Sequence, residues 1–303
     1  MAITAQDVKA LREMTGVGMM DCKKALAASD GDMDKAVEWL REKGLAASAK
    51  KAGRIAAEGM AYAADIDGVG VVVEVNAETD FVGKNEKFVD FVKGVAATVA
   101  SCAPADLDAL MECKYNGTDL TVTQQQQEMV LVIGENIKVR RFARFADGVS
   151  VPYIHAGGKI GVLVNLEVTG GIDATEIGKD MAMQIAALNP RFLDKSQVTQ
   201  EVLDEEKKIL LAQMANDPKM ASKPDKVKEN IVAGKLNKFY AENCLLQQAF
   251  VKDGDVTVEQ YMNAAAKQLG GTITLKDAVR FEKGEGIEKK QENFAEEIAK
   301  LAK

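Results

Sequence analysis

Side chains that could do chemistry are few in this sequence and widely separated. There is a single histidine, His155, so motifs in which two histidines bind a metal ion are excluded. The single histidine is also the only candidate general base for a nucleophilic serine or cysteine. The flanking residues, 151–154 and 156–158, predict a turn between two strands, where a lone histidine is usually just solvated. No pair of carboxylates stands out, and we expect neither a catalytic centre, nor a metal site, nor an enzymatic activity.

Nucleotide-binding motifs are also missing. The sequence has no G-x-x-x-x-G-K-[ST] loop, so it does not look like a GTPase, and no G-x-G-x-x-G follows a strand-like run. The net charge is −7, from 39 Lys and Arg against 46 Asp and Glu, which disfavours a general nucleic-acid binder. Aromatic residues make up 5% and are not interleaved with basic ones, so stacking on single strands is also disfavoured. We expect no cofactor and no direct contact with nucleic acid.

The cysteines and the apolar runs indicate a cellular compartment. The four cysteines form no C-x-x-C pair, so we expect reduced thiols; they are Cys22, Cys102, Cys113 and Cys244. No run approaches the ~18 apolar residues of a membrane span. The N-terminus lacks the basic segment and apolar core of a secretory signal. These features predict a cytoplasmic protein that does not enter a membrane.

The most informative stretch is residues 71–82. Its valine-rich first half is typical of a strand buried on both faces, and its second half holds the polar residues of a turn or helix start. Apolar residues then recur with helical spacing at Phe88, Phe91, Val92, Val95 and Val99. Phe81 precedes that apolar face, in the strand-to-helix connection. It either packs under the helix as a staple or forms an exposed aromatic wedge, beside a carboxylate, presented to a partner.

Residues 1–45 predict a compact bundle of three helices. Gly16 interrupts the first helical pattern, and Gly44 is expected to close the third helix. Met19 and Met20 stand at the loop before the second helix. They are either flexible fillers of the core or a soft apolar surface that docks on a partner.

Beyond this bundle, one plan of strands and helices occurs twice. The run 160–168 is similar to 71–76, and 273–284 echoes 137–148. From Gly70 to Ile137 is 67 residues and from Gly161 to Ile273 is 112, so the second copy carries 45 more. This difference predicts two related subdomains with an insertion in the second.

The insertion predicts an antiparallel helical hairpin, over about 199–215 and 225–240, with prolines at its tip. We therefore predict an α+β fold with a two-part core, an inserted hairpin and a C-terminal helix. Its predicted parts are a three-helix domain (1–45), a helical linker (46–57), the first core subdomain (58–148), the second core subdomain (149–190 and 241–284), the hairpin or coiled coil (191–240) and a C-terminal helical module (285–303).

Four segments, in matching order along the chain, resemble the elongation factor Ts family. They are Thr15-Gly16-Val17-Gly18-Met19-Met20-Asp21-Cys22-Lys23-Lys24-Ala25-Leu26, then Thr79-Asp80-Phe81-Val82, then the segment from His155 to Val164, and Arg280-Phe281-Glu282-Lys283-Gly284-Glu285-Gly286-Ile287-Glu288. The resemblance implies a ubiquitin-associated-like bundle at the N-terminus, a two-part core, a protruding coiled coil and a C-terminal helix.

The resemblance also implies a function, that of a guanine-nucleotide exchange factor in translation elongation. Such a protein would bind elongation factor Tu·GDP, promote displacement of Mg²⁺ and release GDP so that GTP can bind. The implied partner-binding residues are Thr79, Asp80, Phe81 and Val82, with Met19, Met20 and His155 as secondary contacts. A homodimer or a two-plus-two complex through the hairpin is left open. The alternative function is a non-catalytic adaptor that recruits proteins through the N-terminal bundle.

Overall fold

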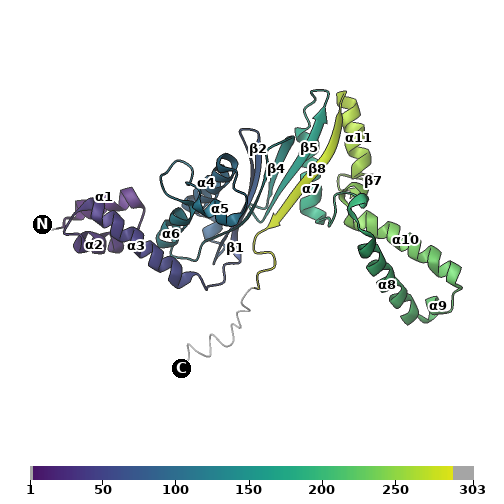
Figure 1. Cartoon of the computed structure of the whole chain (residues 1–303), viewed down its shortest axis with the longest axis horizontal. Coiled ribbons are helices and arrows are strands. Elements are labelled where there is room, and N and C mark those ends of the chain that lie inside the picture. Colours follow the sequence, from purple (N-terminus) through teal and green to yellow (C-terminus); the bar gives the residue numbers. More distant parts are fainter. Residues whose placement is uncertain (1–2, 289–303) are drawn as a thin grey trace.

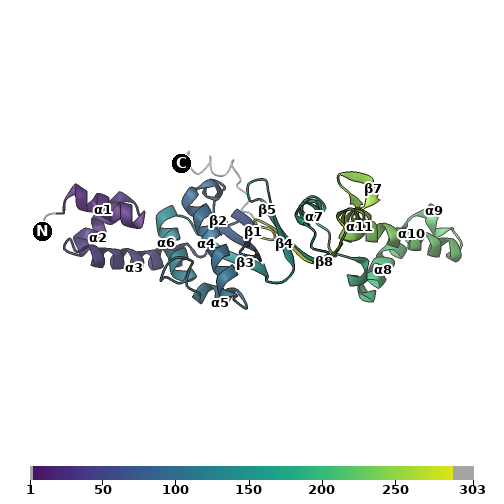
Figure 2. The same ribbon diagram turned by 90° about the horizontal axis from the view of Figure 1, so that it is seen from above.

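The protein is an elongated α+β molecule with two antiparallel sheets at its centre (Figure 1). The computed structural model describes residues 3–288. Three N-terminal helices form one end and a helical hairpin forms the other, and Figure 2 shows the same line of parts from above. The predicted fold class is confirmed. No helix among the described residues is both long and apolar enough to cross a membrane. The predicted C-terminal helix, about 291–301, lies outside the described residues.

The N-terminal bundle consists of α1 (Ala5–Thr15), α2 (Met19–Ala28) and α3 (Met33–Lys51). Gly16 ends α1 with φ of 69°, a left-handed conformation that favours glycine. The prediction that Gly44 closes the third helix is wrong, because α3 continues to Lys51. At Gly44, α3 passes so close to α6 (Val122–Ile133) that a Cβ there would lie 3.3 Å from the Gln127 carbonyl oxygen. Gly44 therefore serves a helix–helix contact.

The first sheet has the order β1 (Glu58–Ile66), β2 (Val69–Ala77) and β3 (Lys138–Phe145). A two-residue turn joins β1 to β2, with φ of 54° at Asp67 and 82° at Gly68, as a tight hairpin requires. Three helices complete this half, namely α4 (Glu86–Cys102), α5 (Leu107–Glu112) and α6. The valines of β2 and the apolar face of α4 share one buried cluster. The double-sided burial expected for β2 is confirmed.

The second sheet repeats this plan with β4 (Val149–His155), β5 (Ile160–Thr169) and β8 (Thr272–Glu282). Its central strand is also followed by a packed helix, α7 (Thr175–Leu188). Each central strand has a β-bulge: β2 has one after Glu74, where it pairs with β3, and β5 has one after Asn165, where it pairs with β8. The remaining elements of this half are β6 (Ala249–Phe250), β7 (Asp253–Thr257) and α11 (Val258–Leu269).

The two sheets pack against each other through small side chains. Ala61, Ala63 and Val72 of the first sheet share a buried cluster with Leu163 and Phe281 of the second. A Cβ at Gly161 would lie 3.1 Å from the Ala61 carbonyl carbon, closer than most real Cβ contacts, so glycine favours this approach. The Ala61 amide also donates a hydrogen bond of 2.8 Å to the Gly158 carbonyl oxygen. The sheets are therefore joined by close backbone contact.

A buried carboxylate adds a polar link between the two halves. Glu74 of β2 is fully buried and accepts hydrogen bonds from Arg140 Nη1 (2.9 Å), Arg141 Nε (2.6 Å), Asn76 Nδ2 (3.0 Å) and the amide of Gly284 (2.8 Å). Burial alone would raise the pKa of Glu74, but these donors more than offset it, so the pKa lies below its usual range. Because Gly284 follows β8, one ionised side chain binds both sheets.

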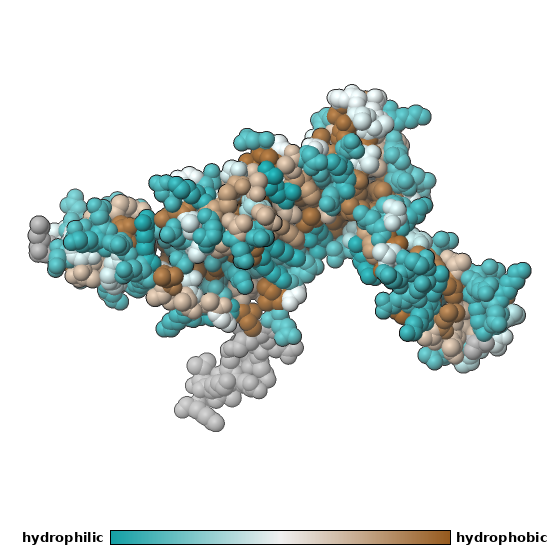
Figure 3. Space-filling model, in the orientation of Figure 1, coloured by the Kyte–Doolittle hydropathy of each residue, from teal (hydrophilic) through white to brown (hydrophobic). Residues whose placement is uncertain are grey.

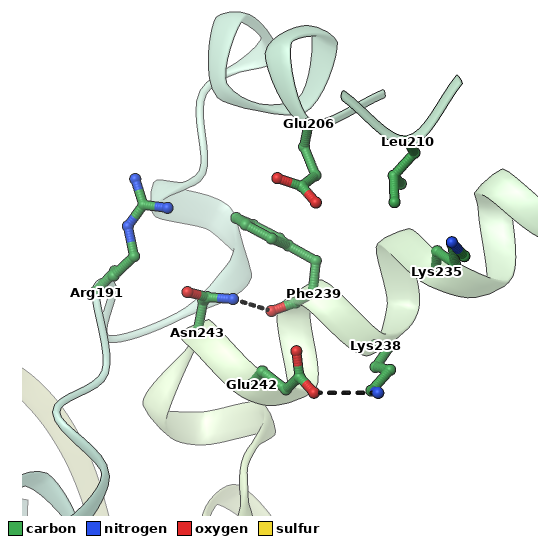
Figure 4. Close-up of a pocket in the computed structure, with 8 residues that line it drawn as sticks. All are labelled: Arg191, Glu206, Leu210, Lys235, Lys238, Phe239, Glu242 and Asn243. Atoms are coloured by element: carbon green, nitrogen blue, oxygen red, sulfur yellow. Dashed lines mark hydrogen bonds and ion pairs between the residues drawn. The ribbon is translucent and has the colours of Figure 1, made fainter. Parts of the chain in front are cut away.

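The hairpin consists of α8 (Gln200–Asn216) and α10 (Asp225–Asn243), with the short α9 (Pro218–Ala221) at its tip. One apolar cluster lies at its base, including Val198, Phe239 and Cys244, and a separate one lies nearer the tip, including Leu210, Met214 and Val232. Figure 4 shows a hollow near the base, lined by Arg191, Glu206, Leu210, Lys235, Lys238, Phe239, Glu242 and Asn243. Apolar residues also reach the surface of the hairpin between hydrophilic ones (Figure 3), among them Ile209 and Leu211.

One expectation about the cysteines is wrong. Cys102, the last residue of α4, and Cys113, just after α5, form a disulfide with their Cα atoms 6.6 Å apart. The chain reverses between the two helices, and Leu110 of α5 is buried in the same cluster as α4, which brings the cysteines together. Cys22 and Cys244 are free thiols, and both are buried.

We predict that Glu74→Gln destabilises the fold by about 2–4 kcal/mol at pH 7, because it removes the charged partner of two guanidinium groups from a buried site. A carboxyl whose pKa is lowered by folding stabilises the protein above its unfolded pKa of about 4.3 and loses this effect as the pH falls. The difference in melting temperature between wild type and variant should therefore shrink below about pH 4. A difference that is constant from pH 7 to pH 3 would contradict the prediction.

We also predict that the distal hairpin is dispensable for folding. Replacing residues 207–236 with a short Gly-rich linker removes the apolar cluster near the tip but keeps the cluster at the base. Circular dichroism should show loss of helix only, and thermal unfolding should stay cooperative. A protein that no longer unfolds cooperatively would show that the hairpin is needed by the core.

Candidate functional site

The connection from β2 to α4, residues 78–85, places one large apolar side chain in solvent. Phe81 is 81% exposed, whereas Val82 is 6% exposed and belongs to the core cluster under α4. Gly83 follows in a short 3₁₀ turn, where a Cβ would lie 2.8 Å from the Gly59 carbonyl oxygen of β1. Val82 thus occupies the buried position and Gly83 lies against β1, which leaves Phe81 outside. The staple alternative for Phe81 is wrong.

Asp80 lies beside Phe81 and is also exposed. Its carboxylate makes no hydrogen bond or ion pair within residues 3–288, so it is available to another molecule. Together, the two residues offer an aromatic ring and a negative charge on one short segment. The arrangement suits recognition, because burying one phenylalanine on a partner contributes roughly 1.5–3 kcal/mol.

Hydrogen bonds hold the start of the connection in place. The partners in these bonds, Glu135, Asn136 and Arg54, were not identified from the sequence. Thr79 donates from its amide to Glu135 Oε2 (3.0 Å) and from its hydroxyl to Glu135 Oε1 (2.6 Å). The Asn136 amide donates to Glu78 Oε1 (2.6 Å), and Arg54 Nη1 approaches the same oxygen at 3.4 Å. Because these partners are 24 to 58 residues apart, no local spacing could have revealed them.

The two methionines of the N-terminal bundle are exposed, Met19 by 55% and Met20 by 66%. Val17 and Cys22 fill the bundle core in their place, so the core-filler alternative for the methionines is wrong. The Lys87 ammonium, in the first turn of α4, donates a hydrogen bond of 3.1 Å to the Gly16 carbonyl oxygen. The loop before α2 is thereby joined to the helix that follows Phe81.

His155 is exposed at the end of β4, and its Nδ1 lies 3.2 Å from the Tyr153 hydroxyl. The turn that follows packs on β1, since a Cβ at Gly158 would lie 2.6 Å from Met60 Cγ. The neighbouring residue of β1, Gly59, contacts Gly83 of the connection. The His155 turn and the Phe81 connection are therefore next to each other across one end of β1.

We predict that Phe81→Ala leaves stability unchanged within about 0.5 kcal/mol, because the ring contributes little to the core. Val82→Ala, one residue further on, is the matched control and should cost about 2 kcal/mol, since it leaves a cavity under α4. Urea denaturation followed by circular dichroism measures both. A Phe81→Ala protein as unstable as Val82→Ala would show that the ring packs inward in solution.

Comparison with known proteins places these residues in a family context. A family model described as elongation factor TS matches residues 78–285, which include the connection and the His155 turn. The chain is 48% identical over 307 residues to an elongation factor Ts from Syntrophotalea carbinolica, with all of both chains covered. It is 50% identical over 312 residues to an elongation factor Ts from Trichlorobacter lovleyi, covering 100% of this chain and 99% of the relative. It is 47% identical to one from Magnetococcus marinus, covering 99% of each.

Proposed function

The chain belongs to the elongation factor Ts family, and we propose that it is the guanine-nucleotide exchange factor of elongation factor Tu. The observation that carries the proposal is the exposed ring of Phe81 on a connection held by hydrogen bonds. Beside it lies the Asp80 carboxylate, which makes no hydrogen bond or ion pair with any residue that the structure describes. The protein acts in the cytoplasm by binding and has no catalytic chemistry of its own. Its partner is a protein rather than a nucleic acid, in line with its net charge of −7.

The mechanism is negative coupling between two ligands of the GTPase. If this protein and GDP each bind elongation factor Tu well but bind poorly together, each weakens the other by the same factor. Burial of the Phe81 ring supplies roughly 1.5–3 kcal/mol, which corresponds to about 10- to 100-fold in GDP affinity. Any larger acceleration must come from the rest of the interface, to which Met19, Met20 and His155 contribute.

The coupling acts through the metal ion of the GTPase. Mg²⁺ bridges the phosphates of a bound nucleotide and neutralises their charge. Insertion of Phe81 near that site displaces Mg²⁺, and the Asp80 carboxylate perturbs the field around the cation. Without the ion, the phosphates are held less tightly, GDP leaves, and GTP can bind in its place.

The hairpin serves a separate contact in this proposal. It projects from the end of the molecule opposite the N-terminal bundle (Figure 1) and exposes Ile209, Leu211 and Val227. These apolar side chains suit either a second copy of the chain or another part of elongation factor Tu. A homodimer or a two-plus-two complex therefore remains part of the proposal.

We predict that the protein accelerates GDP release most strongly when Mg²⁺ is abundant. The measurement follows fluorescent GDP leaving elongation factor Tu with Mg²⁺ and, separately, with a chelator. The acceleration should shrink in the chelator, because the ion that this protein displaces has already gone. Asp80→Ala should show a partial loss of acceleration in Mg²⁺, and Phe81→Ala should lose about 30-fold, as for a buried aromatic residue worth ~2 kcal/mol.

Two results would count against the proposal in different ways. An equal acceleration with and without Mg²⁺ would overturn the displacement of the ion but leave exchange by steric insertion of Phe81. No acceleration under either condition would overturn the exchange function and favour the adaptor alternative.

A further inference from the structure

We propose that Glu135 is a positioning residue that holds the start of the β2–α4 connection in the conformation that presents Phe81. The inference rests on the proposed function and deepens it, because it names what shapes the binding segment before the partner arrives. Glu135 acts through Thr79, its hydrogen-bond partner, and need not touch elongation factor Tu itself.

The geometry uses both oxygens of the Glu135 carboxylate. One accepts from the Thr79 amide at 3.0 Å and the other from the Thr79 hydroxyl at 2.6 Å. Bonds to an ionised acceptor are stronger than neutral ones, and two parallel bonds also fix orientation. Glu135 is aimed there by Gly134, which ends α6 with φ of 87°. The backbone of Thr79 is thereby held two residues before Phe81.

The adjacent residues make a second set of bonds. The amide of Asn136 donates to Glu78 Oε1 at 2.6 Å, while its side-chain nitrogen donates to the Arg54 carbonyl oxygen at 2.8 Å. Glu78 is thus bonded to Asn136 and Thr79 to Glu135, and the bond to Arg54 connects this pair of segments to the chain after α3. Asn136 is buried and Glu78 and Arg54 are not, so this second set is only partly shielded from water.

These bonds are needed because the exposed ring does not hold its own segment in place. After Phe81, the connection is fixed by burial of Val82 and by contact of Gly83 with Gly59. Before Phe81, Thr79 and Asp80 are exposed and belong to none of the apolar clusters, so hydrogen bonds are what fixes this part of the connection. A segment that is ordered only on binding loses its conformational freedom at that step and binds more weakly.

The test compares Glu135→Ala and Glu135→Gln with wild type in two measurements. The first is hydrogen–deuterium exchange of the Thr79 amide in the free protein, resolved by NMR. The second is GDP release from elongation factor Tu as a function of the concentration of this protein. The matched control is Glu112→Gln, since Glu112 is an exposed carboxylate with no hydrogen bond or ion pair in the described part of the chain.

We expect Glu135→Ala to speed exchange of the Thr79 amide and to raise the half-saturating concentration by about 3- to 10-fold, as for loss of a stabilising hydrogen bond. The plateau rate should stay unchanged, because a fractionally populated competent state weakens apparent affinity only. Phe81→Ala should instead lower the plateau. Glu135→Gln keeps one acceptor oxygen and should fall in between, and Glu112→Gln should behave as wild type.

A double-mutant cycle between Thr79→Val and Glu135→Ala tests the pairing directly. Because each variant breaks the same hydroxyl contact, their effects on the half-saturating concentration should be less than multiplicative. Fully multiplicative effects would overturn the pairing.

The remaining outcomes separate this inference from the proposed function. Unchanged exchange of the Thr79 amide in Glu135→Ala would overturn the inference even if wild type releases GDP normally. Faster amide exchange with an unaltered concentration dependence would overturn the positioning role. An inactive wild-type protein would overturn the proposed function and the positioning role with it, whereas the amide measurement would still show whether Glu135 holds Thr79.

Discussion

The rest of the structure depends on the burial of β2 on both of its faces. Side chains of a strand alternate between faces, so Val71, Val73 and Val75 pack toward α4 while Val72 packs toward the second sheet. Glu74 lies on the same face as Val72, which places its carboxylate between the two halves of the core. There it meets two arginines of β3 and the Gly284 amide after β8. A charge in this position is tolerated because four donors replace the water that it loses.

The exposure of Phe81 follows from how this strand ends. The chain must leave a buried strand and begin a helix whose apolar face is already covered, and Val82 takes the one buried position of the connection. Gly83 then brings the backbone against β1, where a side chain would not fit. A ring that is 81% exposed contributes almost nothing to the core, so folding does not account for it, whereas the proposed function gives it a role. The residues that fix the connection and the residue that it exposes are different.

Local patterns were sufficient where the structure is locally determined. Helical spacing of apolar residues from Phe88 to Val99 predicted α4, and the valine-rich run that begins at Val71 predicted the buried strand β2. Contacts between distant segments were not readable in the same way. The glycine at position 44 is explained by the contact of α3 with α6, whose residues lie about 80 positions away. Without that contact in view, Gly44 has the appearance of a helix end. The disulfide, the Glu135–Thr79 pair and the choice between an inward and an outward Phe81 likewise depend on how separate elements pack.

The exposed segments differ in how they are connected to the core. The loop before α2 is joined to the helix after the Phe81 connection by the hydrogen bond from Lys87 to Gly16. The Phe81 connection is joined to the His155 turn through β1, because Gly83 contacts Gly59 and Gly158 packs on Met60. These contacts fix the relative positions of the three segments within the fold. At the base of the hairpin, backbone hydrogen bonds between residues 191–193 and 243–246 join its two legs to each other. Leu193, Leu245 and Leu246 of this base pack in the apolar cluster of the second half of the core. The hairpin is thus anchored in the second half of the core, whereas the Phe81 connection lies in the first, so the proposed function assigns these two contacts to separate halves of the core.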